Sequence, residues 1–151
     1  MKNGGLNLEI RDKFLSSSVV PVSADEVSRI SGAANSIREV FAQSDPHFGY
    51  NAASVKSLSD NVDAERQTFP AFDKVRLANQ YGAFLGHTIL TLHPQGRWVK
   101  YEGDLAILFE RAGQKRLVFP ILRLARHIEQ GRSAAMYPLF VAVGDFMTAT
   151  R

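Results

Sequence analysis

Apolar side chains recur every three or four positions between residues 27 and 41, the spacing that lines one face of a helix. Just before this run, Ser23 and Glu26 form a capping box, in which the serine hydroxyl accepts from the Glu26 amide while the carboxylate reaches back. Pro46 disfavours helical backbone in the residue before it. The pattern predicts a first helix from about residue 22 to Gln43, with a buried face of Val27, Ile30, Ala34, Ile37 and Phe41.

Two further helices are predicted between Asn51 and Leu92. Asn51 is a suitable N-cap for a short helix, whose apolar face consists of Val55, Leu58 and Val62. Pro70 suits the first turn of a longer helix that reaches about Leu92. The more polar side of this long helix carries Arg76, Asn79, Gln80, Ala83 and His87.

Two glycines, Gly82 and Gly86, lie four positions apart inside the long helix. A glycine inside a helix costs roughly 1 kcal/mol relative to alanine. We therefore expect another backbone segment, in the first helix or the last, to pack closely against them.

After residue 96 the period of the pattern changes from about three and a half to two, which is typical of strands. Strands over 97–101, 105–110 and 116–119 with tight connections predict an antiparallel meander. A lone tryptophan is usually buried, so Trp98 is expected in the core. Pro120 then opens a helix that ends at Gly131, and a last helix is expected over about 134–147.

The beginning of the chain is weakly patterned. Leu6, Leu8 and Ile10 alternate with polar residues, which suggests an arm or edge strand within residues 1–20. The order of the elements predicts an α+β fold, a three-stranded antiparallel β-meander packed by four to five helices. We expect the 151 residues to form one domain, because no repeat or low-complexity linker divides them.

Composition narrows the class of protein. Hydrophobic residues make up 45% of the chain, so it has enough apolar side chains for a core. No apolar run approaches the ~20 residues that span a bilayer, and the first residues lack the apolar stretch of a secretory signal. These features predict a cytoplasmic protein that does not enter membranes. The absence of cysteine excludes disulfides and thiolate chemistry.

Positive charge is concentrated in the second half. Residues 71–151 carry 11 Lys and Arg against 6 Asp and Glu, a net of +5. On the helix after Pro120, Arg123, Arg126 and His127 fall opposite Ile121 and Leu124, so we expect them to be exposed. Charge runs of this kind are most often solvated faces that keep a protein soluble, but such a face can also bind phosphates or a partner's carboxylates. The candidate partner-binding residues are Lys115, Arg116, Arg123, Arg126, His127 and Arg132.

No motif for catalysis, cofactor or metal binding is visible. The four histidines lack the spacing of a helical zinc site, and no serine lies in a nucleophile elbow. Gly82 to Gly86 lacks the Lys-Ser/Thr that follows a phosphate-binding loop. The sequence therefore predicts no cofactor and no bound metal, and assigns no catalytic residue.

Several motifs carry a resemblance to a known group. They are Ser54-Val55-Lys56-Ser57-Leu58-Ser59 with Glu65-Arg66, Tyr81-Gly82-Ala83-Phe84-Leu85-Gly86, Gly96-Arg97-Trp98-Val99, and Phe119-Pro120 ahead of a helix that ends at Gly131. Over roughly residues 50–131 the chain resembles a functionally uncharacterised family of small bacterial domains. The resemblance implies no established activity, so it carries over no site residue.

Three functions remain open from the sequence. The first is a non-enzymatic, cytoplasmic protein–protein interaction module, of immunity type or regulatory, whose partner has an acidic surface. The second is a small nucleic-acid or polyanion-binding protein that uses the basic helix face. The third is an enzyme whose site forms only in three dimensions.

Overall fold

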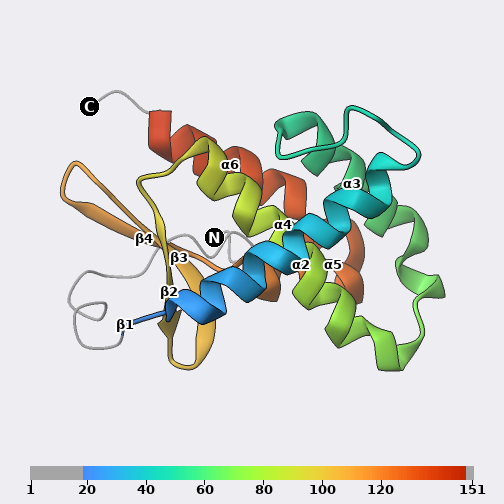
Figure 1. The fold of residues 1–151 in the computed structure, drawn as a ribbon, viewed down its shortest axis with the longest axis horizontal. Coiled ribbons are helices and arrows are strands. Elements are labelled where there is room, and N and C mark those ends of the chain that lie inside the picture. The colour runs from blue at the N-terminus through green and yellow to red at the C-terminus, as the bar shows by residue number, and fades with distance from the viewer. Residues whose placement is uncertain (1–18, 149–151) are drawn as a thin grey trace.

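The computed structural model describes residues 19–148 and shows an α+β fold. Figure 1 shows the sheet at one end of the molecule and most of the helices at the other. Within the described residues there are five α-helices, three short 3-10 helices and one antiparallel sheet of four strands, in the order β1-β2-β3-β4. The elements are β1 (Val19–Pro21), α2 (Ala24–Ala42), α3 (Ala52–Glu65), η1 (Arg66–Thr68), η2 (Ala71–Asp73), α4 (Lys74–Leu92), β2 (Arg97–Tyr101), β3 (Asp104–Arg111), β4 (Gln114–Val118), α5 (Pro120–Gln130), η3 (Gly131–Ala134) and α6 (Met136–Thr148).

The fold class is confirmed, but the expected number of strands is wrong. A fourth strand, β1, pairs antiparallel with β2, with Val19 opposite Tyr101 and Pro21 opposite Val99. A strand of three residues is too short to show a period of two, and it is defined by its pairing with the edge of β2. The strand that the sequence suggests around Leu6 to Ile10 lies outside the described residues.

The caps of α2 and α3 form as the sequence predicts. The Ser23 hydroxyl accepts from the Glu26 amide at 3.1 Å, and the Asn51 side chain accepts from the Ser54 amide at 2.8 Å. Each side chain satisfies a helix amide that has no intrahelical partner. Because Asn51 fixes the beginning of α3, it also fixes which side chains of that helix point into the protein.

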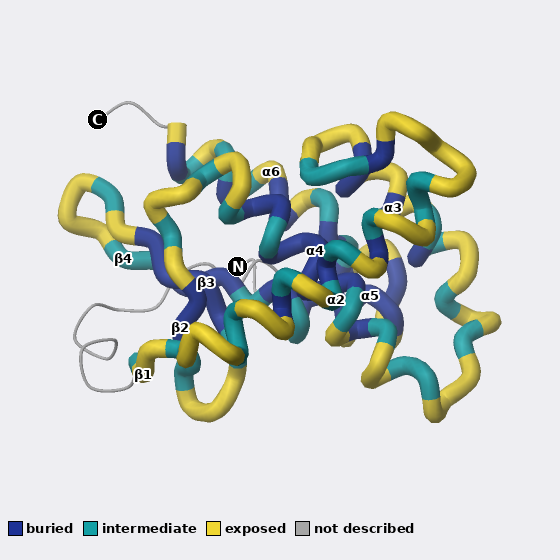
Figure 2. Tube along the Cα trace, in the orientation of Figure 1, coloured by how far each residue is buried: buried dark blue, intermediate teal, exposed yellow. Residues whose placement is uncertain are grey.

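Helix α4 lies at the centre of the packing, between α2 and α5. Figure 2 shows that buried residues concentrate along it. The close approach predicted at Gly82 is present, but the neighbour is α5 rather than the first or the last helix: a Cβ on Gly82 would lie 2.6 Å from the Cα of Ile121. At Gly86 the neighbour is the Trp98 ring, which is buried as expected. The two glycines thus allow α5 and β2 to approach α4.

The sheet has two apolar faces. The inner face packs on the helices and presents Trp98, Ile107, Phe109 and Val118 to the main core. The outer face carries a second small cluster of Val99, Ala106, Leu108 and Leu117. This alternation follows from the period of two along each strand.

Tight turns join β2 to β3 and β3 to β4. Glu102 and Ala112 have φ of 53° and 54°, and the glycines that follow them also have positive φ. Two-residue hairpins with two positive φ angles match the right-handed twist of the strands.

The last two helices come close to the predicted ranges. Helix α5 begins at Pro120 and its C-cap is Gly131, with φ of 81°. A 3-10 turn over Gly131–Ala134 follows, so α6 begins at Met136, two residues later than expected. No helix in the described part of the chain combines the length and apolar character needed to cross a bilayer.

Candidate functional site

The six predicted partner-binding residues do not form a common exposed face. Lys115 is half-buried, with its Nζ 3.6 Å from Glu110 Oε2. Arg116 is half-buried, with its guanidinium carbon 5.0 Å from the centre of the Phe146 ring of α6. The Arg132 side chain is 87% exposed. Their role in binding a partner stays a prediction, but it does not rest on a shared exposed surface.

The expected exposure of Arg123 and His127 is wrong. They are 3% and 0% exposed, whereas Arg126 is half-buried. The physical reason is that α5 is covered on two sides. Helix α4 packs against Ile121, and the chain then folds back so that α6 begins beside His127. The buried arc of α5 is therefore wider than its apolar stripe, and it includes two polar side chains.

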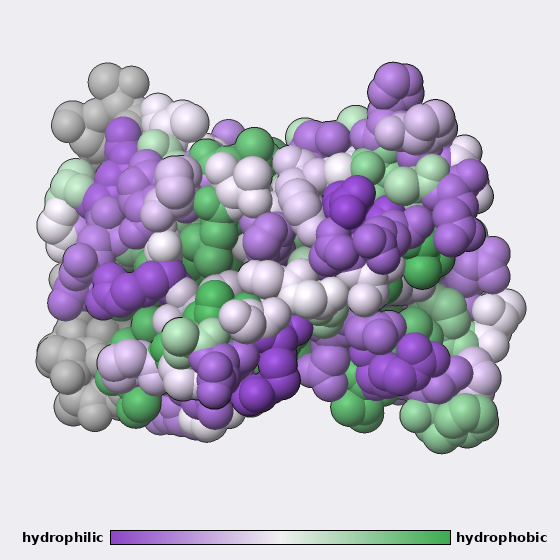
Figure 3. Space-filling view, viewed as in Figure 1, coloured by the Kyte–Doolittle hydropathy of each residue, from purple (hydrophilic) through white to green (hydrophobic). Residues whose placement is uncertain are grey.

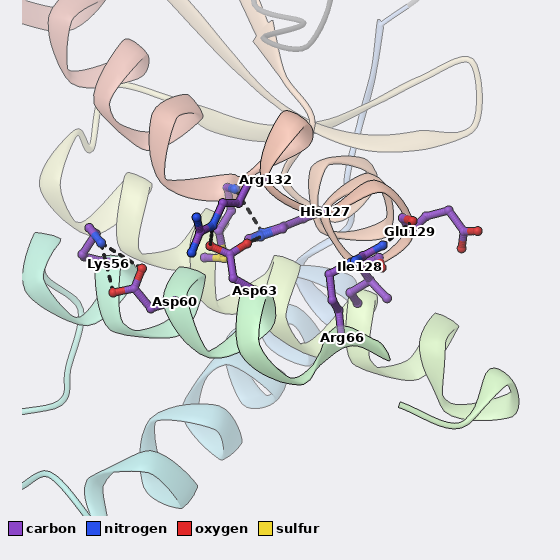
Figure 4. Close-up of polar contacts among 9 residues, drawn as sticks. Lys56, Asp60, Asp63, Arg66, His127, Ile128, Glu129 and Arg132 are labelled. Atoms are coloured by element: carbon purple, nitrogen blue, oxygen red, sulfur yellow. Dashed lines mark hydrogen bonds and ion pairs between the residues drawn. The ribbon is translucent and has the colours of Figure 1, made fainter. Parts of the chain in front are cut away.

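His127 connects three elements of the fold (Figure 4). Its Nε2 lies 2.7 Å from Oδ1 of Asp63 on α3, and its Nδ1 accepts from the backbone amide of Met136 at 3.2 Å. Since the amide can only donate, Nδ1 carries no proton and Nε2 donates to the carboxylate. Burial lowers the pKa of His127, partly offset by the hydrogen bond to Asp63.

The geometry of the Asp63–His127 pair determines what it can do chemically. An Asp–His pair acts as a general base when one ring nitrogen is free to take a proton from a substrate. In His127 both ring nitrogens are engaged, and the side chain has no exposed surface. The pair therefore holds α3, α5 and the start of α6 together rather than presenting a base to a substrate.

Arginines reinforce the same junction. Arg66 donates from Nε to the Ile128 carbonyl at 2.9 Å and from Nη2 to the Glu129 carbonyl at 2.7 Å. These are among the last carbonyls of α5, which have no intrahelical donor. The Arg132 Nε lies 3.5 Å from Asp63 Oδ2. Figure 4 shows these contacts converging where α3 meets the end of α5.

A groove between α4 and α5 is the most suitable binding surface in the described residues. Its volume is about 240 Å³, and its lining is mostly apolar: Val75, Ala78, Ile121, Ala125 and Ile128, with Lys74, Asn79 and Glu129. Val75, which lines the groove, is 73% exposed, and Phe72, in η2 just before α4, is 85% exposed. Figure 3 shows hydrophobic residues at the lower right of the view, over the segment that leads into α4.

The sequence pattern did not indicate this groove. Val75 falls on the apolar arc of α4, so it reads as a core position, and Phe72 precedes the helix proper. The pair of glycines in α4 indicates only that another element packs near the middle of this helix, and it carries no information about Val75 or Phe72.

A second hollow of about 240 Å³ lies on the outer face of the sheet. Its lining combines apolar strand residues with three charged ones, Arg97, Glu110 and Lys115. The exposed valine next to its lining residues, Val20, is 56% exposed, less than Val75 and Phe72.

No function follows from similarity to known proteins or from a grouping of metal ligands. Comparisons with family models, with curated proteins and with solved structures found no match to the chain. The resemblance to a family of small bacterial domains stays a prediction. Within residues 19–148, no three potential His, Asp or Glu ligands are grouped as a metal ion requires.

Proposed function

We propose that this chain is a protein–protein interaction module whose docking surface is the α4–α5 groove together with Phe72 and Val75. The observation that carries the proposal is an apolar groove whose lining residue Val75 is 73% exposed, with Phe72, three residues earlier in the chain, exposed to 85%. A solvent-exposed phenylalanine and valine next to an apolar floor are characteristic of protein contact surfaces. This reading keeps the regulatory or immunity-type role expected from the sequence and moves its site away from the basic residues.

The groove favours a helical segment as the partner's contacting element. Two packed helices leave a groove between them, which a third helix can fill with apolar side chains at positions i, i+3, i+4 and i+7. Lys74 and Glu129 both line the groove, so its rim carries one charge of each sign. The partner helix is therefore expected to flank its apolar ridge with an acidic side chain toward Lys74 and a basic one toward Glu129, which speed association more than they add affinity.

The polyanion alternative has less support. Nucleic-acid binding requires several cations presented together, and the basic residues between 111 and 132 point to different parts of the fold. Arg123 is buried, Lys115 lies near Glu110, and Arg116 lies over Phe146.

The proposal is tested by selecting helical peptides from a displayed library on the purified chain. Two variants then report where the selected peptides bind: Val75→Asp in the groove, and Val40→Asp, which places the same charge on a valine of α2 that is 58% exposed. Residue 75 lies in the first turn of α4, where an acidic side chain favours the helix, so Val75→Asp is expected to fold.

We expect enriched peptides with an apolar ridge and flanking charges complementary to Lys74 and Glu129, which bind wild type and Val40→Asp equally and lose most of their affinity for Val75→Asp. Two results would overturn the proposal. One is the absence of enrichment above background. The other is enrichment of acidic peptides without apolar spacing that bind Val75→Asp as well as wild type, a result that would favour the polyanion alternative.

A further inference from the structure

Arg123 is a buried cation with one edge of its guanidinium unpaired. The side chain is 3% exposed, and in the described structure neither Nε nor Nη2 has a hydrogen-bond partner. Leaving buried charged donors unsatisfied is among the more costly arrangements in a protein. Burial and the neighbouring Arg126 lower the pKa of Arg123 to about 10, so the group still carries its charge at neutral pH.

The charges near Arg123 favour an anion beside it. His127 lies one turn after Arg123 on α5, and both Arg66 and Arg123 act electrostatically on it. Asp63, the carboxylate at this junction, already accepts from His127 and lies near Arg132. Arg123 is also the fourth residue of α5, where the helix dipole disfavours a cation.

The unpaired atoms also define the shape of the missing partner. Nε and Nη2 form one edge of the guanidinium, whose parallel N–H groups match two oxygens of one carboxylate or phosphate. A single acceptor such as a backbone carbonyl satisfies only one of them. An oxyanion with two accessible oxygens satisfies both and supplies the countercharge.

We propose that Arg123 is the anchor of an enclosed site for a small oxyanion, phosphate or carboxylate in type, which binds side-on to Nε and Nη2 beneath the packing of α5 and α6. The site is separate from the α4–α5 groove, because Arg123 shares a face of α5 with His127, four residues later, whereas Ile121 lies on the opposite side, toward α4. The two proposals therefore stand or fall independently.

The test is titration of the full chain with sodium phosphate or sodium acetate at constant ionic strength. Calorimetry measures binding, and thermal unfolding measures the change in stability. Sodium chloride replaces the titrant in the reference. The variants are Arg123→Met, which keeps length and removes charge; Arg123→Lys, which keeps charge and removes the paired edge; and Arg132→Met as the matched exposed control. Comparison of phosphate with acetate distinguishes the two classes of oxyanion.

We expect one oxyanion to bind wild type and Arg132→Met with a 1:1 stoichiometry and to raise their unfolding temperature. Binding should be lost in Arg123→Met and weakened about tenfold or more in Arg123→Lys, because one charged hydrogen bond is lost. Without added oxyanion, Arg123→Met should melt no lower than wild type, since it removes an unpaired buried charge.

Three results would overturn the proposal. They are the absence of saturable binding of both anions to wild type, unchanged binding in Arg123→Met, and a strong loss of stability in Arg123→Met without added anion. The last result would mean that a partner within the protein already satisfies the guanidinium. Failure of Arg123→Met to fold counts as this last result, and undiminished binding in Arg123→Lys separately contradicts the side-on geometry.

Discussion

His127 illustrates, at the scale of single residues, how a polar side chain is held in an apolar interior. Its ring donates to Asp63 and accepts from the Met136 amide, so neither ring nitrogen is left unsatisfied. A buried polar group is tolerated when its hydrogen bonds are complete. Arg123, one turn earlier, lacks such partners on one edge of its guanidinium. The contrast between the two residues is what makes Arg123 a candidate ligand-binding group and His127 a structural one.

The pH dependence of stability follows from the state of His127. Its pKa in the folded protein is lowered, chiefly by burial, and an unfolded histidine titrates near 6.5. The unfolded chain therefore binds more protons as the pH falls below about 6.5, so the free energy of unfolding decreases there. Charged neighbours act on the ring in both directions: Asp63 raises its pKa, and Arg66 and Arg123 lower it.

Urea unfolding of wild type and His127→Gln at pH 7.5 and 5.5 measures this effect. We expect His127→Gln to be less stable at pH 7.5 but to lose less stability on acidification than wild type. His87, whose pKa burial also lowers, provides the control: His87→Gln should keep most of the wild-type pH dependence because its ring is only half-buried. Equal pH dependence in wild type and His127→Gln would contradict the assignment.

The turn between β3 and β4 offers a second prediction at residue scale. Ala112 has φ of 54° and precedes Gly113, and an alanine Cβ is strained in this left-handed region. Asparagine tolerates the region better, and Asn-Gly is a favoured pair in such hairpins. Ala112→Asn should therefore raise the free energy of unfolding by up to about 1 kcal/mol.

Chemical denaturation of Ala112→Asn measures the gain, and Gly113→Ala provides the opposite change. Gly113 has φ of 79° and open space around it, so any loss of stability on adding a methyl group reflects backbone strain alone. An Ala112→Asn variant whose unfolding midpoint lies at a lower denaturant concentration than that of wild type would contradict the strain assigned to this turn.

At the scale of elements, the close packing of α5 on α4 depends on Gly82. A Cβ there would lie 2.6 Å from the Cα of Ile121, a backbone atom that cannot move away by itself. Gly82→Ala is therefore expected to destabilise the protein by roughly 1–3 kcal/mol through overpacking.

Gly144 in α6 is the matched control for Gly82. It is also inside a helix, but nothing lies within 4 Å of a Cβ placed on it. Gly144→Ala should be neutral or stabilising by up to about 1 kcal/mol, the difference in helix propensity. Thermal or urea unfolding compares the two variants. Similar effects of both substitutions would show that Gly82 does not mediate close packing.

The elements that could be predicted from the sequence are those that carry their own signals. Ser23 and Asn51 mark the beginnings of α2 and α3 through local hydrogen bonds, and the period of two marks β2, β3 and β4. Strand β1 has three residues and depends on pairing with a distant strand. The buried side of α5 was misjudged because the apolar stripe was taken as its whole buried arc, although α4 and the start of α6 cover it from two directions.

At the scale of the whole molecule, the candidate site could not be predicted because it belongs to no single element. The α4–α5 groove requires residues from 74–79 and 121–129 to lie side by side, and their order along the chain does not reveal this. The Asp63–His127 contact likewise joins residues 64 positions apart. The charge counts correctly identified a basic region of the sequence, but the fold places its Lys and Arg residues in the interior, on the sheet and on the surface.

The central claim is that partners dock on the α4–α5 groove, and amide chemical-shift mapping tests it most directly. A helical peptide selected on the chain is titrated into isotopically labelled protein. The account predicts that the largest shifts fall on residues 72–79 and 121–129, and that Val75→Asp removes them while Val40→Asp does not. Shifts concentrated on the outer face of the sheet, around Val99 and Leu108, or around Arg132, would contradict it.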